Sequence, residues 1–142
     1  MLKQLSVMVE NKPGSALSVM KMLSEANVNA RSITISESQE SGIIRLIVDN
    51  VDKAERVLSG NFEAVKVTDV IGFSIPDEPG GLCRVMQILE DNGINIRYSY
   101  SLMVNREGKA DIVIRVKKSA IEKTMAVLSQ AGIKLLTLDD IS

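Results

Sequence analysis

The sequence contains no histidine and no tryptophan, and it has one cysteine among its 142 residues. Without histidine it lacks the commonest general base, the Ser-His and Cys-His nucleophile pairs, and most zinc or iron sites. Cys83 has no second cysteine for an internal disulfide, which, with no signal peptide recognisable, is typical of a reducing cytoplasm. No group of carboxylates has the spacing of a metal site or an acid–base pair. The composition therefore predicts a protein that is not an enzyme and uses no cofactor and no metal.

The sequence also lacks a large excess of charges of one sign, and it lacks a long apolar run. Lys and Arg number 17 against 18 Asp and Glu, a net charge of −1, so there is no electrostatic footprint for nucleic acid or an anionic membrane. The longest run without a charged residue extends from Thr124 to Ile133, whereas a membrane-spanning helix needs about 20 apolar residues. We therefore expect a globular cytoplasmic protein that binds no nucleic acid and no membrane.

What the sequence does contain is an internal repeat. Residues 7–31 and 73–97 align without a gap at a constant offset of 66. The seven identical pairs are Pro13/Pro79, Gly14/Gly80, Val19/Val85, Met20/Met86, Leu23/Leu89, Asn29/Asn95 and Arg31/Arg97. We interpret the chain as two copies of one unit of about 70 residues, with domains at 1–69 and 70–142.

Both copies show the same succession of patterns. Leu5, Val7 and Val9 alternate with polar positions, as in a half-buried strand, and residues 71, 73 and 75 repeat this alternation. A Pro-Gly turn follows, and then a helix is predicted over 15–26 and 81–92. The apolar face of that helix is expected at Leu17, Val19, Met20 and Leu23, and at Leu82, Val85, Met86 and Leu89. Asn27 and Gly93 stand where a helix ends in a left-handed residue.

The remaining elements complete a β-α-β-β-α-β order in each copy. The expected ranges are strands from 29 and 95, hairpins at 37–42 and 105–109, return strands at 43–48 and 111–116, helices at 51–59 and 119–130, and last strands at 65–70 and 133–138. This order predicts an α+β fold: two ferredoxin-like βαββαβ units in tandem, each an antiparallel sheet with both helices on one face.

The repeated motif resembles a known family. Asn11-Lys12-Pro13-Gly14 with Asn27-Val28-Asn29-Ala30, and Asp77-Glu78-Pro79-Gly80 with Gly93-Ile94-Asn95-Ile96, are similar to the N-x-P-G turn and the G-[IV]-N-I strand opening of the ACT domain. This domain is a small regulatory module of many enzymes of amino-acid metabolism. The resemblance covers nearly the whole chain as two ACT units. It therefore implies a stand-alone tandem ACT protein.

The resemblance also implies a ligand and partners. ACT units bind a free amino acid at the interface between two units, against the turn before the first helix, and the family regulates enzymes of amino-acid metabolism. The uncovered sheet face and edge strands of such units predict a homodimer. Asn11 and Asn29 match the two asparagines that hold the ligand in a serine-binding relative, and Asn95 matches the second asparagine again. Asp77 replaces the first asparagine in the second copy. A carboxylate there receives an α-ammonium but repels a carboxylate, so the two half-sites need not be equivalent.

The residue chemistry agrees with such a site. Glycine lets a backbone approach a ligand closely, and the free N–H groups of a helix N-terminus favour an anion such as a carboxylate. An asparagine side chain offers a donor and an acceptor together. The candidate turn residues are Pro13, Gly14, Ser15 and Ala16 in the first copy, and Pro79, Gly80, Gly81 and Leu82 in the second. Except in the prolines, their N–H groups are expected to be free.

Each candidate has a structural interpretation as well. Asn11 is equally suited to a turn that satisfies its own backbone, and Asn29 and Asn95 to fixing the corner between helix and strand. Ser15 is suited to capping its helix. Cys83 aligns with Leu17, so we expect packing in the core and not thiol reactivity.

Two further pairs of residues also have both a structural and a functional interpretation. Tyr98 and Tyr100 point to one face of their strand, where packing between units competes with a stacking platform for a ligand. Arg31 and Arg97 are suited to a shared salt bridge or to a carboxylate clamp.

Three hypotheses of function follow. The leading one is an amino-acid sensor whose ligand favours one packing of the units over another. The second is a protein-interaction subunit that has kept the fold and lost the ligand, and Asp77 keeps this hypothesis open. The third is an unrecognised enzyme, which the lack of histidine and of any nucleotide-binding loop argues against.

Overall fold

The computed structural model describes residues 1–142 and divides into two compact units. The N-unit comprises Lys3–Thr68 with Ser142, and the C-unit comprises Asp69–Ile141 with Met1–Leu2. The division after Thr68 lies one residue from the boundary expected after residue 69. Strand β4 (Val65–Pro76) passes this point without a break, so that its first four residues belong to the N-unit and the others to the C-unit.

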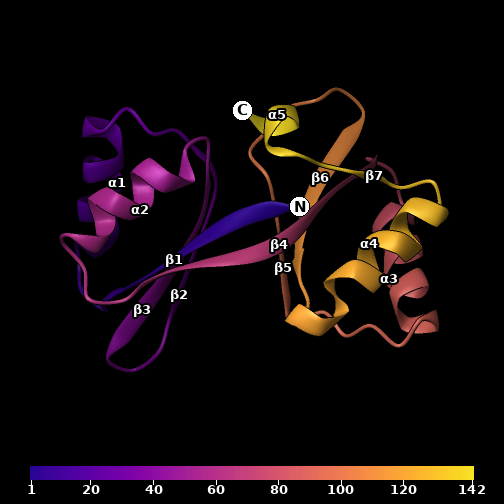
Figure 1. Cartoon of the computed structure of the whole chain (residues 1–142), viewed down its shortest axis with the longest axis horizontal. Helices are drawn as coiled ribbons and strands as arrows, with labels where there is room; N and C mark the ends of the chain where they lie inside the picture. The colour runs from indigo at the N-terminus through magenta and orange to yellow at the C-terminus, as the bar shows by residue number, and fades with distance from the viewer. The chain divides into compact units, whose positions relative to one another are not determined.

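The N-unit is a sheet with two helices on one side (Figure 1). Its elements are β1 (Leu2–Glu10), α1 (Ser15–Glu25), β2 (Ala30–Glu37), β3 (Ser41–Val48), α2 (Val51–Ser59) and the beginning of β4. The strand order is β2-β3-β1-β4, and β3 is antiparallel to both of its neighbours. Val19 and Leu23 of α1 and Leu58 of α2 pack against alternate residues of β1 and β3 to form one core.

The C-unit repeats this arrangement. It contains the rest of β4, α3 (Gly81–Asp91), β5 (Tyr98–Ser101), β6 (Lys109–Arg115), the 3-10 helix η1 (Lys118–Ala120), α4 (Ile121–Gln130), β7 (Lys134–Leu135) and α5 (Leu138–Ile141). The order β5-β6-β4-β7 matches that of the N-unit. The predicted α+β fold of two ferredoxin-like units is therefore confirmed.

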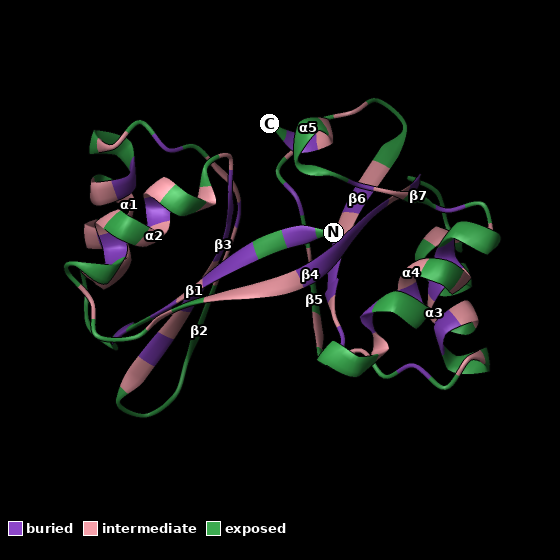
Figure 2. Cartoon of the chain, in the orientation of Figure 1, coloured by how far each residue is buried: buried purple, intermediate pink, exposed green.

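Alternation along the first strand of each unit decides which face is buried. Leu5 and Val7 of β1 are fully buried, as is Phe73 of β4, while Met8 is 50% exposed. Figure 2 shows the same division, with buried residues on the helix sides that face the strands. Because successive side chains of a strand point to opposite faces, the period-two pattern in the sequence identified the core positions of both strands correctly.

The expected apolar face of the first helix was partly wrong. Val19 and Leu23 in α1, and their counterparts in α3, are buried, but Leu17 is 57% exposed, Leu82 is 41% exposed and Cys83 is exposed. Leu17 precedes Val19 by two residues, which is roughly 200° around the helix. Leu17 and its counterpart Cys83 therefore face away from the core, and the expectation that Cys83 packs there was wrong.

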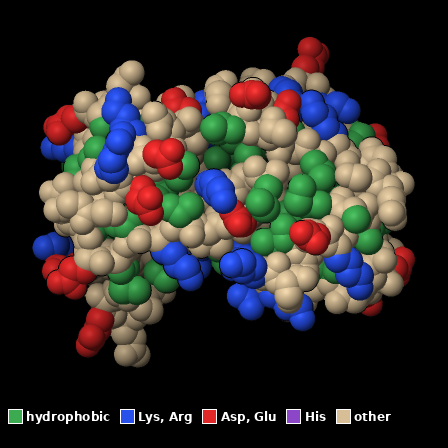
Figure 3. Space-filling model, viewed as in Figure 1, with side chains coloured by type: hydrophobic (Ala, Val, Ile, Leu, Met, Phe, Trp, Pro, Cys, Tyr) green, Lys and Arg blue, Asp and Glu red, His purple; other side chains and the backbone are tan.

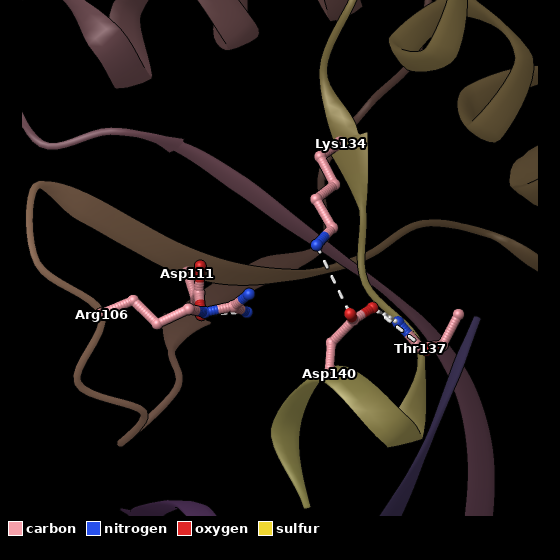
Figure 4. A network of polar contacts seen from close by, with 5 residues as sticks. All are labelled: Arg106, Asp111, Lys134, Thr137 and Asp140. Carbon is pink, nitrogen blue, oxygen red and sulfur yellow. Dashed lines mark hydrogen bonds and ion pairs between the residues drawn. The ribbon is translucent and has the colours of Figure 1, made fainter.

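The expected last strand of the second copy was also wrong in length. β7 contains only Lys134 and Leu135, and a new helix, α5, begins at Leu138. Asp140 Oδ2 accepts hydrogen bonds from the main-chain N–H (2.8 Å) and the hydroxyl (3.0 Å) of Thr137 (Figure 4). A backbone N–H of Thr that donates to the side chain of an acidic residue three positions later is one of the two hydrogen bonds of a capping box. The segment 137–140 carries that signal, which ends the strand and starts a helix.

Candidate functional site

The two Pro-Gly turns lead directly into α1 and α3. Gly14 and Gly80 are the N-cap residues, with φ of 89° and 87°, and Ser15 N–H donates to Lys12 O at 3.4 Å, closing the turn. Proline followed by a residue of positive φ is a type II turn, which glycine adopts without steric cost. The residues that the sequence predicted for the two turns therefore all lie at the starts of these helices: Pro13, Gly14, Ser15 and Ala16, and Pro79, Gly80, Gly81 and Leu82.

Two details of the predicted turn site need correction. Ser15 is not the N-cap, because Gly14 holds that position and α1 has no side-chain cap hydrogen bond. The N–H groups of Ser15 and Gly81 are not free either, since each closes its turn, the latter on Glu78 O at 3.1 Å. The amides of Ala16 and Leu82 lie in the first helical turn, where no helical acceptor precedes them.

Asn11 and Asp77 are held against the hairpins of their units. The main-chain N–H of Asn11 donates to Glu40 O at 3.4 Å, and that of Asp77 donates to Gly108 O at 3.0 Å. The side-chain Nδ2 of Asn11 also donates to Ser38 O at 3.3 Å. The carboxamide of Asn11 therefore fastens the β2–β3 hairpin to the turn, with its oxygen left for another donor.

Asn29 lies at the opposite end of the N-unit from Asn11. Its main chain is fixed by Asp49, whose Oδ1 accepts from Asn29 N–H at 2.9 Å and whose N–H donates to Asn29 O at 3.1 Å. Because β1 and β2 both run antiparallel to β3, α1 separates the two asparagines along the sheet by about 16 Å. The structure does not bring Asn11 and Asn29 of one unit together.

Asn95 takes the corresponding place in the C-unit. It borders a shallow depression of about 420 Å³ at the end of α3, together with Met86, Glu90 and Gly93. Asn95 is thus also remote from the Pro-Gly turn of its own unit, by the length of one helix.

The N-unit has a groove beside its Pro-Gly turn, which we call the N-groove. Its volume is about 700 Å³, and it is lined by residues 8–10, 12–15, 18, 40–41 and 61–64. Pro13, Gly14 and Ser15 were expected at such a site. The sequence did not predict four further lining residues, because they come from three separate segments: Ser18, Glu40, Asn61 and Glu63. The one sign of a difference in the sequence was that Ser18 of the first copy aligns with Arg84 of the second.

The N-groove has an excess of negative charge. Lys12 Nζ lies 3.1 Å from Glu10 Oε2, so these two charges offset one another. Glu40 and Glu63 remain, and three carboxylates against one ammonium leave a net charge of −2 on the lining. The N-terminus of α1 supplies the opposite polarity, because a helix N-terminus carries about half a positive charge. The groove offers the positive end of the α1 dipole, the hydroxyls of Ser15, Ser18 and Ser41, and carboxylates, which together suit a zwitterion.

Tyr98 and Tyr100 stack on one another. Their ring centroids are 6.4 Å apart and their planes differ by 15°, which confirms that both side chains lie on one face of β5. Whether a ligand also stacks on them stays a prediction.

Charges are mixed over the surface. Acidic and basic side chains are interspersed on the face drawn in Figure 3, with hydrophobic patches between them. None of the helices combines the length and the hydropathy that crossing a bilayer requires.

Comparisons with known proteins agree with this architecture. A family model described as an ACT domain pair matches residues 1–141. A crystal structure of a protein from Bacteroides thetaiotaomicron is 38% identical, with a TM-score of 0.89, and the alignment covers 99% of this chain and 94% of that one. The ligand-free regulatory subunit of aspartate kinase from Thermus thermophilus is 17% identical, with a TM-score of 0.67 and 92% of each chain covered. No curated protein matches the chain.

A longer enzyme contains a similar fold. Aspartate kinase from Synechocystis is 21% identical, with a TM-score of 0.62, and the alignment covers 96% of this chain but only 26% of the kinase. At this identity the similarity concerns the fold alone.

Proposed function

Because the chain belongs to the family of ACT domain pairs, we propose that it is a non-catalytic sensor that binds a free amino acid in the N-groove. One observation carries this proposal: the groove lies between the N-terminus of α1 and a set of carboxylates. The positive end of the helix dipole suits an α-carboxylate and the carboxylates suit an ammonium. Both charges of a zwitterion thus find a partner in one groove.

The sensor works by shifting a conformational equilibrium. A ligand in the N-groove contacts the turn, the hairpin at Glu40 and Ser41, and the segment 61–64 at once. These parts come from different elements, so a ligand that prefers one arrangement of them stabilises it by the difference in its affinity for the two arrangements.

We further propose that the sensor is a homodimer. Asn29 is about 16 Å from the turn of its own unit, too far to share a ligand with Asn11. Asn11 and Asn29 act on one ligand only if a second copy of the chain supplies Asn29. Light scattering at micromolar concentration tests this: a mass near 31 kDa, twice the 15.5 kDa of the chain, supports the dimer, and a monomer contradicts it.

The regulated partner is an enzyme of amino-acid metabolism. The similar folds include regulatory subunits of aspartate kinase, from Thermus thermophilus and Thermus flavus. Each of these chains is covered over more than nine-tenths of its length, so a regulatory subunit of this size and fold exists for such an enzyme.

A thermal-shift screen against the twenty amino acids tests the function. A ligand at about a hundred times its dissociation constant stabilises the folded state by about 2.7 kcal/mol, which raises the melting temperature by roughly 5–10 °C. One hit that is weakened in Ser18→Trp, which fills the N-groove, supports the sensor. Shifts that stay within about a degree for every amino acid contradict it.

The second candidate is an interaction subunit without a ligand. The observation in its favour is that Asn11 Nδ2 already has an acceptor within the chain, Ser38 O. This candidate predicts that an enzyme partner is bound in stoichiometric amount and is released by no amino acid. A partner that dissociates when an amino acid is added supports the sensor instead.

A further inference from the structure

The two units differ at the place that forms the N-groove. Ser18 lines the groove in the N-unit, and the residue aligned with it in the C-unit is Arg84, at the offset of 66. Arg84 Nη2 donates to the main-chain carbonyl of Ala131 at 2.8 Å. Its side chain therefore reaches from α3 to the C-terminal end of α4.

Ala131 corresponds to a residue that lines the N-groove. Met8 of β1 and Ser74 of β4 are aligned at the offset of 66. Ser74 pairs with Lys134, and the N–H of Met8 donates to Ala64 O, so Ala64 and Lys134 occupy equivalent places in their units. Counting back three residues from Lys134 and Ala64 matches Ala131 with Asn61. The C-unit thus holds a cation of its own where the N-groove is open.

The position suits a cation for a physical reason. Ala131 is the C-cap of α4, and the carbonyls at the end of a helix carry about half a negative charge, which stabilises nearby cations. In the N-unit the equivalent segment follows α2, and Glu63 adds a full negative charge two residues beyond Asn61. The N-groove therefore has a full negative charge at this place that the C-unit lacks, because Ile133 stands two residues beyond Ala131.

From this comparison we propose that the N-groove selects an amino acid with a cationic side chain, such as lysine, ornithine or arginine. The side-chain cation lies near Asn61 and Glu63, where Arg84 lies in the C-unit, and the α-carboxylate lies at the N-terminus of α1. This inference rests on the proposed function, and it adds the chemical class of the ligand. It also assigns Arg84 as the group that closes the equivalent groove of the C-unit.

Calorimetry with three ligands tests the charge preference. L-lysine and L-norleucine have the same carbon chain and differ by the terminal ammonium, and L-glutamate carries the opposite side-chain charge. With two uncompensated carboxylates on the lining, lysine is expected to bind at least about tenfold more tightly than norleucine, and glutamate more weakly than either. Raising sodium chloride from 0.05 M to 0.5 M should reduce the preference for lysine, because the lining carboxylates are exposed.

Two substitutions locate the cation. Glu63→Gln is expected to weaken lysine binding by about threefold to tenfold while norleucine binding stays unchanged. Glu25→Gln is the matched control, because Glu25 is also exposed but lies at the far end of α1, outside the groove. It should leave the lysine affinity within about twofold.

A third substitution copies the closed unit. Ser18→Arg places in α1 the residue that closes the C-unit, and it is expected to abolish lysine binding. Ser24→Arg adds the same charge on an exposed position of the same helix outside the groove, and binding should persist. Circular dichroism is the check that both variants are folded.

The possible results separate the two proposals. Lysine binding that is lost in Ser18→Arg and weakened in Glu63→Gln supports the inference. Tighter binding of a neutral or acidic amino acid overturns the inference and leaves the sensor standing. If no amino acid binds to the wild-type chain, the proposed function itself fails.

Discussion

At the scale of single residues, the two Pro-Gly turns differ in how closely the chain approaches itself. A Cβ atom on Gly14 would meet no atom within 4 Å, whereas a Cβ atom on Gly81 would lie 2.8 Å from the carbonyl oxygen of Pro76. Glycine is required at position 14 by the φ of 89°, and at position 81 because there is no space for a Cβ atom. Ser15 fills the position equivalent to Gly81 in the N-unit, so this close approach is confined to the C-unit.

Gly81→Ala should therefore destabilise the protein, while Ser15→Ala should not. Relief of the contact with Pro76 O requires a shift of backbone, which typically costs about 1–3 kcal/mol. Ser15 makes no side-chain cap hydrogen bond, so its replacement should change the free energy of unfolding by less than about 0.5 kcal/mol. Urea denaturation measures both, and equal values for the two variants would contradict this interpretation.

A second residue that sets the units apart is Asp111. Its side chain is 1% exposed, and Arg106 donates to its Oδ2 from Nε (3.0 Å) and Nη2 (2.6 Å), while Oδ1 has no hydrogen-bond partner within the chain (Figure 4). Asp111 pairs with Ser74 as Ile43 pairs with Met8. The N-unit thus has an apolar residue where the C-unit has a buried carboxylate.

Arg106→Met should be strongly destabilising, because it leaves the carboxylate of Asp111 buried without its counter-charge. Removal of one partner of a buried ion pair typically costs about 3–5 kcal/mol, and the cost is expected near the lower end because the Arg106 side chain is partly exposed. The double variant Arg106→Met/Asp111→Ile, which copies the apolar residue of the N-unit, should recover most of that loss. The free energies of unfolding of the two single variants and the double variant form the test. A double variant less stable than Arg106→Met would rule the explanation out.

At the scale of elements, α5 shows how four residues stop a strand. Lys134 lies in β7, yet its Nζ is 3.4 Å from Asp140 Oδ1 in α5 (Figure 4). The main-chain N–H of Thr137, its hydroxyl and then Lys134 all stabilise the carboxylate, and they hold the pKa of Asp140 below its ordinary value. The charge of Asp140 therefore helps α5 to form.

This lowered pKa fixes the sign of a pH effect. A carboxyl group whose pKa is lower in the folded state adds stability above its unfolded pKa of about 3.9, and that stability is lost as the pH falls through the folded pKa. Asp140→Asn should lower the melting temperature at pH 7, and the difference from wild type should shrink below pH 4.

The amide proton of Thr137 reports the same event directly. Its NMR chemical shift should titrate with a midpoint below about 3.9 in the wild type and should not titrate in Asp140→Asn. Asp139→Asn changes an exposed neighbouring charge and should leave the midpoint unchanged. A midpoint at or above the ordinary value would contradict the proposed role of the capping box.

At the scale of the whole molecule, the two copies of one unit differ in whether a groove is open beside the Pro-Gly turn. The N-groove is open beside Ser18, and Arg84 crosses the equivalent place in the C-unit to reach Ala131 O. The chain is thus expected to bind one amino acid, not two. Calorimetry should give a stoichiometry near one ligand per chain in the wild type, and a value of two would contradict the role of Arg84.

The sequence by itself determined the fold and the position of the turns. Alternation at Leu5 and Val7 and at Ile71 and Phe73 specifies the buried face of a strand, because side-chain direction follows directly from backbone geometry. The Pro-Gly pairs similarly specify their turns, since only glycine takes a φ near 90° without cost.

The tertiary structure decided which groove is open and what lines it. Arg84 and Ala131 are 47 residues apart, and Asn11 meets Ser38 across 27 residues. Contacts of this kind depend on where the ends of separate helices and strands come together in space, and no local pattern encodes that. For the same reason the sequence predicted a binding site at the turn of residues 13–15 but did not reveal that Glu40, Asn61 and Glu63 lie beside this turn.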